Sequence, residues 1–177
     1  MRRWMARSLA VLAAAAVVHA ALVFSFPWLV MRVAHNRIAA RAGGVNIVVH
    51  NPPTTAEHNP IVNSSPDLLY SACAFDLAGG PVRIRARVPA TYWSVSGYDA
   101  ETNNFFSVNN EGARAGLLDL VLAGPGGAVP EAGAARAVVS PSMRGVVLFR
   151  TLVPTADRMG EMVRVQKQAV CLPLAEK

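Results

Sequence analysis

The sequence lacks the short motifs by which many enzymes are recognised. It contains no G-x-S-x-G turn, no Gly-rich phosphate-binding loop and no H-E-x-x-H zinc motif. Histidine is also scarce, and only His35, His50 and His58 lie outside the apolar N-terminal segment. Because a serine or cysteine nucleophile needs a base within hydrogen-bond reach, a hydrolase of standard type has little support. The sequence favours a non-catalytic role and predicts no cofactor.

Cysteine is equally rare, with Cys73 and Cys171 as the two examples. They form no CxxC pair and have no histidine at the spacing of zinc ligands, so a structural zinc site is not expected. In an exported domain the two thiols could pair as a disulfide. The alternative is two buried thiols that act as small hydrophobic groups. The residues alone leave both open.

Acidic residues are absent from the first 41 positions, which carry six Arg. In the remainder, nine Arg and two Lys are balanced by eleven acids, so the net charge of +6 belongs entirely to the N-terminal region. Basic residues there lie where anionic lipid headgroups would be. A nucleic-acid-binding protein would place its basic stripe on the folded domain. No nucleic-acid partner is therefore expected.

An apolar run extends over residues 9–30 and holds 22 residues without a formal charge. At about 1.5 Å per residue, a helix of this length covers the roughly 30 Å hydrocarbon core of a bilayer. Trp4 and Trp28 lie near the two ends of this run, and tryptophan is enriched at the two membrane–water interfaces of transmembrane helices. The competing interpretation is a signal peptide cleaved after Ala20, but no polar region surrounds that position. The sequence predicts a basic tail over residues 1–8 and a transmembrane anchor over residues 9–31, with the lipid bilayer as a partner.

The charges around the apolar run do not determine which end of the anchor faces the cytoplasm. Three Arg precede the apolar run and three follow it, so the positive-inside rule does not decide. Long domains cross the membrane largely regardless of charge. We expect a single-pass protein of a bacterial inner membrane with a periplasmic domain.

A juxtamembrane linker is predicted over residues 32–44. After it, the apolar residues no longer form a continuous run but alternate with polar residues. Over residues 82–88 apolar side chains share one face, whereas Arg83, Arg85 and Arg87 share the other, which is typical of a half-buried strand. The arginine row is either an anion-binding surface or a solvated strand face. Further strands are expected over residues 45–50, 68–77, 92–98, 105–108, 117–122, 135–139 and 144–152, followed by a short helix over 155–166 capped by Thr155 and an extended segment over 169–174.

Short strands separated by turns, without interleaved helices, predict the fold class. We expect a mainly β domain over residues 45–177, an antiparallel sandwich or jelly-roll-like arrangement, with one N-terminal transmembrane helix and a short C-terminal helix.

Two clusters of side chains are candidate sites. Asp99, Thr102, Asn103 and Asn104 at a turn, with Tyr98 and Trp93 nearby, would suit a polar or sugar-like ligand. Alternatively, the polar side chains form hydrogen bonds with the backbone of the turn, and the aromatic rings fill a hydrophobic core. His50, Glu57 and His58 are ligand types of catalytic zinc. Their spacing matches no known motif, and the alternative is exposed polarity in a Pro-rich loop.

Several segments taken together resemble a bacterial family called domain of unknown function 1254. They are residues 65–77 (SPDLLYSACAFDL), 79–82 (GGPV), 89–99 (PATYWSVSGYD) and 102–106 (TNNFF), and the resemblance covers roughly residues 45–125. It implies the short, membrane-anchored version of that family. Such proteins tend to accompany a second domain, of unknown function 1214, so the resemblance implies a separately encoded companion. It carries over no catalytic residues.

These observations give a leading hypothesis and an alternative. The first is a non-catalytic envelope module that associates with a companion membrane protein. The alternative is a small-ligand-binding or hydrolytic subunit that uses the 98–104 turn or the His50/His58 loop.

Overall fold

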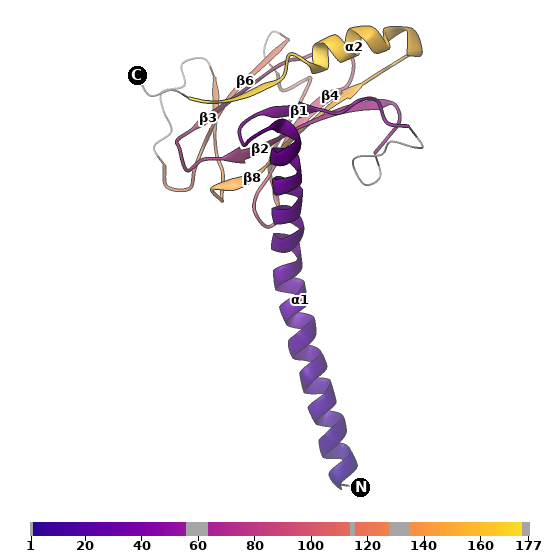
Figure 1. Cartoon of the computed structure of the whole chain (residues 1–177), viewed down its shortest axis with the longest axis vertical. Coiled ribbons are helices and arrows are strands. Elements are labelled where there is room, and N and C mark those ends of the chain that lie inside the picture. The colour runs from indigo at the N-terminus through magenta and orange to yellow at the C-terminus, as the bar shows by residue number, and fades with distance from the viewer. Residues whose placement is uncertain (1, 56–63, 114–115, 128–134, 175–177) are drawn as a thin grey trace.

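The chain folds into a β domain from which a long helix projects (Figure 1). A computed structural model describes residues 2–55, 64–113, 116–127 and 135–174. Helix α1 spans Arg2–Ala42, and its most apolar part has no side chain buried by the rest of the protein. It is long and apolar enough to cross a membrane.

The C-terminal quarter of α1 is part of the domain. Residues 32–44, predicted as a linker, are instead helical as far as Ala42. Gly43 then adopts a φ of 80°, and the Gly44 N–H donates to the Ala39 carbonyl at 2.9 Å, as in a Schellman cap. The helix continues because Met31 and His35, four residues apart on one face, are buried against the domain.

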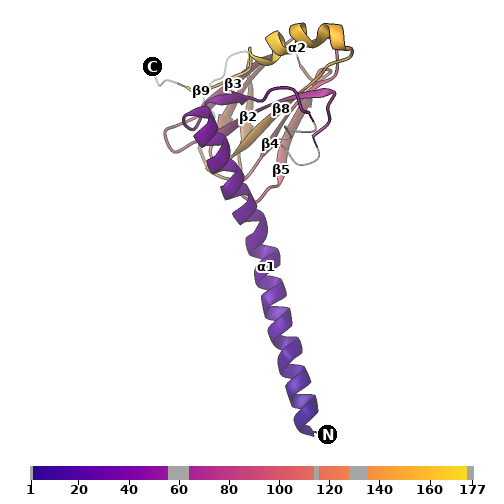
Figure 2. The same cartoon turned by 45° about the vertical axis from the view of Figure 1, so that its right-hand side comes forward.

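In the described ranges, nine strands form two sheets. The two views show the sheets packed against each other above the projecting helix (Figures 1 and 2). The five-stranded sheet has the order β1-β2-β8-β4-β5, and the four-stranded sheet has the order β7-β6-β3-β9. All pairings are antiparallel except β6 with β7, which is parallel. The predicted fold class is confirmed. The bounds are β1 Val48–His50, β2 Leu68–Asp76, β3 Val82–Arg87, β4 Trp93–Tyr98, β5 Asn104–Asn109, β6 Leu117–Ala123, β7 Arg136–Val139, β8 Arg144–Leu152 and β9 Val170–Pro173.

The predicted C-terminal helix is present as a 3-10 turn, η1 (Ala156–Arg158), followed by α2 (Met159–Gln166). Thr155 stands at the N-cap position, but its side chain makes no capping hydrogen bond, so the predicted cap is wrong in this detail. The turn is closed by the backbone instead, because the Arg158 N–H donates to the Thr155 carbonyl at 3.1 Å.

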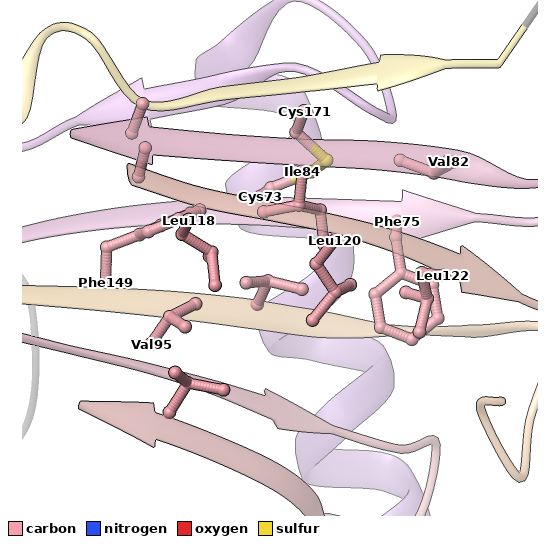
Figure 3. Packing of buried hydrophobic residues seen from close by; sticks show 14 of the residues in the cluster. Cys73, Phe75, Val82, Ile84, Val95, Leu118, Leu120, Leu122, Phe149 and Cys171 are labelled. Atoms are coloured by element: carbon pink, nitrogen blue, oxygen red, sulfur yellow. A yellow bond between two sulfur atoms is a disulfide. The ribbon is translucent and has the colours of Figure 1, made fainter. Parts of the chain in front are cut away.

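The inner faces of the two sheets meet in one hydrophobic core (Figure 3). Phe75, Val95 and Val147 from the five-stranded sheet are fully buried there. From the four-stranded sheet, Ile84 and Leu120 are fully buried as well. At about 1.5–3 kcal/mol for each large apolar side chain, these contacts are the main stabilising contribution.

Strand β2 is buried on both faces, unlike the alternating β3. Its outward-facing Ala72 packs with Val146 against Met31 and Ile38 of α1. Helix α1 therefore occupies the outer face of the five-stranded sheet, and the outer face of the four-stranded sheet lies on the opposite side of the domain.

Candidate functional site

The polar turn after β4 uses its own side chains to close. One carboxylate oxygen of Asp99 accepts the backbone N–H groups of Glu101 and Asn103, both at 2.8 Å. The other accepts the Asn103 side-chain amide at 3.1 Å. Asp99 is buried, and Thr102 has a φ of 70°, as tight turns require. The polar groups thus have structural partners, and ligand binding at this turn stays a prediction.

The aromatic residues predicted beside this turn do not come together. Trp93 is 2% exposed and lies in the core, whereas Tyr98, at the far end of β4, points to the opposite face. The Tyr98 hydroxyl accepts a hydrogen bond from Arg150 at 3.2 Å. Asn104 donates its side-chain amide to the Gly97 carbonyl at 3.2 Å. Trp93 and Tyr98 therefore do not share one wall beside this turn.

His50 pairs with a serine that sequence reasoning did not single out. Its Nδ1 lies 2.9 Å from Ser71 Oγ, because β1 and β2 pair with these two residues opposite each other. Burial, followed by the charge of Lys167, lowers the pKa of His50 below its ordinary value of 6.5. A neutral imidazole beside a hydroxyl is the first element of a nucleophile–base pair. Ser71 is only 1% exposed, so its hydroxyl is covered in this structure.

The other two predicted metal ligands, Glu57 and His58, lie outside the described residues. Within the described ranges, no three His, Cys, Asp or Glu side chains come close enough to hold a metal ion. Gln166 ties α2 to this region by donating to the carbonyls of Asn51 and Tyr70 at 3.1 and 2.9 Å. The metal site itself stays a prediction.

Cys73 and Cys171 are joined by a disulfide between β2 of one sheet and β9 of the other (Figure 3). Their Cα atoms are 6.5 Å apart, and both side chains are at most 1% exposed. The disulfide links β9, the last described strand, to β2, against which α1 packs.

The arginine row of β3 contacts one acid on the neighbouring strand. Arg83 binds the Asp119 carboxylate through two N–H groups at 2.8 and 2.7 Å, and Arg85 binds it at 3.1 Å. The hydrogen bonds from Arg83 outweigh burial, which acts in the opposite direction, and lower the pKa of Asp119 to about 2. Arg87 makes no ion pair with any described residue. One carboxylate thus contacts two of the three guanidinium groups.

Apolar side chains lie exposed on the same face. Leu117 and Val139 are each 48% exposed, and Leu172 is 55% exposed. Strand register places two of them beside the arginines, because Leu117 is opposite Arg87 and Leu172 is opposite Arg83. Val139 lies on β7, where it pairs with Ala123 of β6. We call this surface the arginine face and define it as Arg83, Arg85, Arg87, Leu117, Asp119, Val139 and Leu172.

A hollow of about 510 Å³ borders the arginine face, and Arg85, Arg87 and Leu117 are among the residues that line it. Arginine with exposed apolar groups is the composition that protein–protein interfaces favour. The sequence signal for this surface was the alternation in β3, but the neighbouring apolar residues come from three other strands. The arginine face is the candidate functional site.

The chain matches one family model and is similar in fold to a solved structure. The model of a family described as "Protein of unknown function (DUF1254)" matches residues 45–173. The structure of the VPA0106 protein from Vibrio parahaemolyticus is similar, with a TM-score of 0.65 and 16% identity over 88% of this chain and 37% of that one. An uncharacterised protein from Burkholderia cenocepacia has a TM-score of 0.49 and 19% identity over 67% of this chain and 34% of that one. No curated protein matches.

Proposed function

Since the chain belongs to the family described as protein of unknown function (DUF1254), we propose its role from the geometry of its surfaces. The protein is a non-catalytic module of the bacterial envelope, held at the inner membrane by α1, and it docks a companion membrane protein through the arginine face. The observation that carries this proposal is the pairing of an exposed apolar helix with an exposed arginine and apolar sheet face on one chain.

The first part of the proposal is the anchor. Large side chains along α1 are exposed, including Leu12 at 66% and Phe24 at 84%. Each such side chain gains about 1.5–3 kcal/mol when it leaves water. A lipid bilayer can cover the whole run at once, which supports membrane insertion of residues 9–31.

The disulfide supports the proposed location of the domain. Disulfides persist in oxidising compartments such as the bacterial periplasm and are rare in the cytosol. The Cys73–Cys171 bond therefore supports a periplasmic domain. A reporter such as alkaline phosphatase, fused to the C-terminus of the full chain, should be active in the periplasm. Activity of a cytoplasmic reporter at the same position would refute this orientation.

The docking partner must complement the arginine face. Three arginines against Asp119 leave a net charge of +2 on this surface, so an acidic and apolar surface is its complement. The chain spans 37% of the length of the Vibrio parahaemolyticus protein, so in that protein the fold is accompanied by further structure. We propose that a separately encoded protein of the domain of unknown function 1214 type is the companion here.

A co-purification experiment tests the docking. The full chain is co-expressed with the companion encoded by the neighbouring gene, solubilised in mild detergent and purified through a tag. Arg87→Glu reverses a charge of the arginine face without breaking an ion pair of the described residues, and it should reduce the recovered companion at least tenfold.

Arg164→Glu is the matched control, because Arg164 is an exposed arginine on α2, outside the arginine face. It should leave recovery unchanged. Equal losses in both variants, or the absence of the companion from the wild-type preparation, would refute docking through this surface.

A further inference from the structure

A second polar surface lies where α1 meets the domain. A cleft of about 400 Å³ opens between the helix and the turns at one end of the five-stranded sheet. Its wall on the helix includes Trp28, Arg32 and Asn36, and its wall on the domain includes Ala100 and Arg144. It is distinct from the arginine face, which lies across the sandwich.

The position of this cleft along α1 is defined by the sequence. Trp28 lies near the end of the apolar run of residues 9–30, and Arg32 follows one helical turn later. The Arg32 guanidinium lies 5.1 Å from the centroid of the Trp28 ring, which is 47% exposed. Indole rings at the end of a membrane helix occupy the headgroup region. If residues 9–31 span the bilayer, the cleft lies level with lipid phosphates.

The charges around the cleft favour an anion. Arg144 donates to Asp76 at 2.7 Å, but its side chain is 68% exposed and a guanidinium has five N–H donors, so several remain available. Arg32 makes no ion pair with a described residue. The nearby Asp99 carboxylate is used inside its own turn. Among the residues that line the cleft, Arg32 and Arg144 are positively charged and none is acidic.

We propose that this cleft binds the phosphate group of an anionic phospholipid from the leaflet around α1. Arg32 and Arg144 donate to the phosphate oxygens from opposite walls, and Asn36 offers an amide donor beside them. This proposal rests on the membrane anchor of the proposed function, but not on docking through the arginine face. The bound lipid would hold the domain at a fixed height above the bilayer.

Native mass spectrometry of the full chain in neutral detergent tests the site. The probes are phosphatidylglycerol, phosphatidylcholine and inorganic phosphate, added separately. The first phosphatidylglycerol should bind at least tenfold more tightly than phosphatidylcholine. Arg32→Gln and Arg144→Gln should each remove most of this preference. Arg37→Gln, a change of an exposed arginine on the same helix that does not line the cleft, should leave it intact.

Three results would overturn the proposal: equal binding of the two lipids, an equal effect of Arg37→Gln, or displacement of the lipid by millimolar inorganic phosphate, which would indicate a site for free anions. Arg144→Gln also leaves Asp76 unpaired, so its thermal unfolding is measured alongside. Arg32→Gln breaks no ion pair and carries the test if the other variant fails to fold. Release of the wild-type protein from membranes by carbonate would instead refute the anchor.

Discussion

Removing the disulfide between Cys73 and Cys171 should lower the free energy of unfolding of the domain by several kcal/mol. The cysteines are 98 residues apart in the sequence. In the chain-entropy model, closing a loop of about 100 residues reduces the entropy of the unfolded state and stabilises the fold by about 4.7 kcal/mol at 25 °C. Domains of this size have total stabilities of about 5–15 kcal/mol. The disulfide therefore accounts for a large share of the free energy of unfolding.

The double variant Cys73→Ala/Cys171→Ala removes the bond and leaves a small gap, because both sulfur atoms are buried. The assay is guanidinium unfolding of the full chain in detergent, followed by the fluorescence of the buried Trp93. The free energy of unfolding should fall by about 3–5 kcal/mol. Wild-type protein treated with a reducing agent should show the same loss of free energy of unfolding, although its two sulfur atoms remain in place. An unchanged unfolding midpoint in both samples would refute the reasoning.

Two further changes test the electrostatics and the packing. The pKa of Asp119 is about 2 in the folded protein, chiefly because of its hydrogen bonds to Arg83, and 3.8 is its ordinary value. A folded pKa below the unfolded one stabilises the protein above about pH 4, and this contribution is lost as the pH falls toward 2. With the arginines partly exposed, the effect is about 1 kcal/mol, so Asp119→Asn should lower the urea midpoint at pH 7 but not at pH 2. At Gly145 an added Cβ would overlap the Tyr98 carbonyl of the neighbouring strand. Gly145→Ala should therefore cost about 3 kcal/mol in urea unfolding, whereas the control Gly79→Ala, which has open space, should change stability little.

The strands could be predicted from the sequence because their signal is local. In β3, Val82 and Ile84 alternate with Arg83 and Arg85, and the structure buries the first pair and leaves the second on the surface. Alternation of this kind depends only on the period of two residues in a strand. The turns between strands are also encoded locally, as in the short connection from β2 to β3 at Gly79 and Gly80.

The contacts between distant segments could not be predicted in the same way. His50 and Ser71 meet because of the register of β1 against β2, and register is not readable from either strand alone. The sequence does not predict the helical extension of α1 beyond residue 31, because Arg32 and Arg37 are typical of a juxtamembrane linker. It is stable because Met31 and Ile38 find apolar partners on the five-stranded sheet, which lie far away in the sequence.

The packed end of α1 restricts what kind of companion the protein can reach. The helix passes from its apolar run into the domain without a flexible joint, and His35 fastens it further by donating to the Phe75 carbonyl at 3.0 Å. A domain joined to its anchor by a flexible linker could reach partners over a wide volume, and this reach would grow with the length of the linker. In the proposed membrane-anchored state, the packed end of α1 would hold the arginine face at one height and orientation above the bilayer. Under the proposed function, the companion must then present its acidic surface at that same height, which favours a partner that is itself held in the membrane.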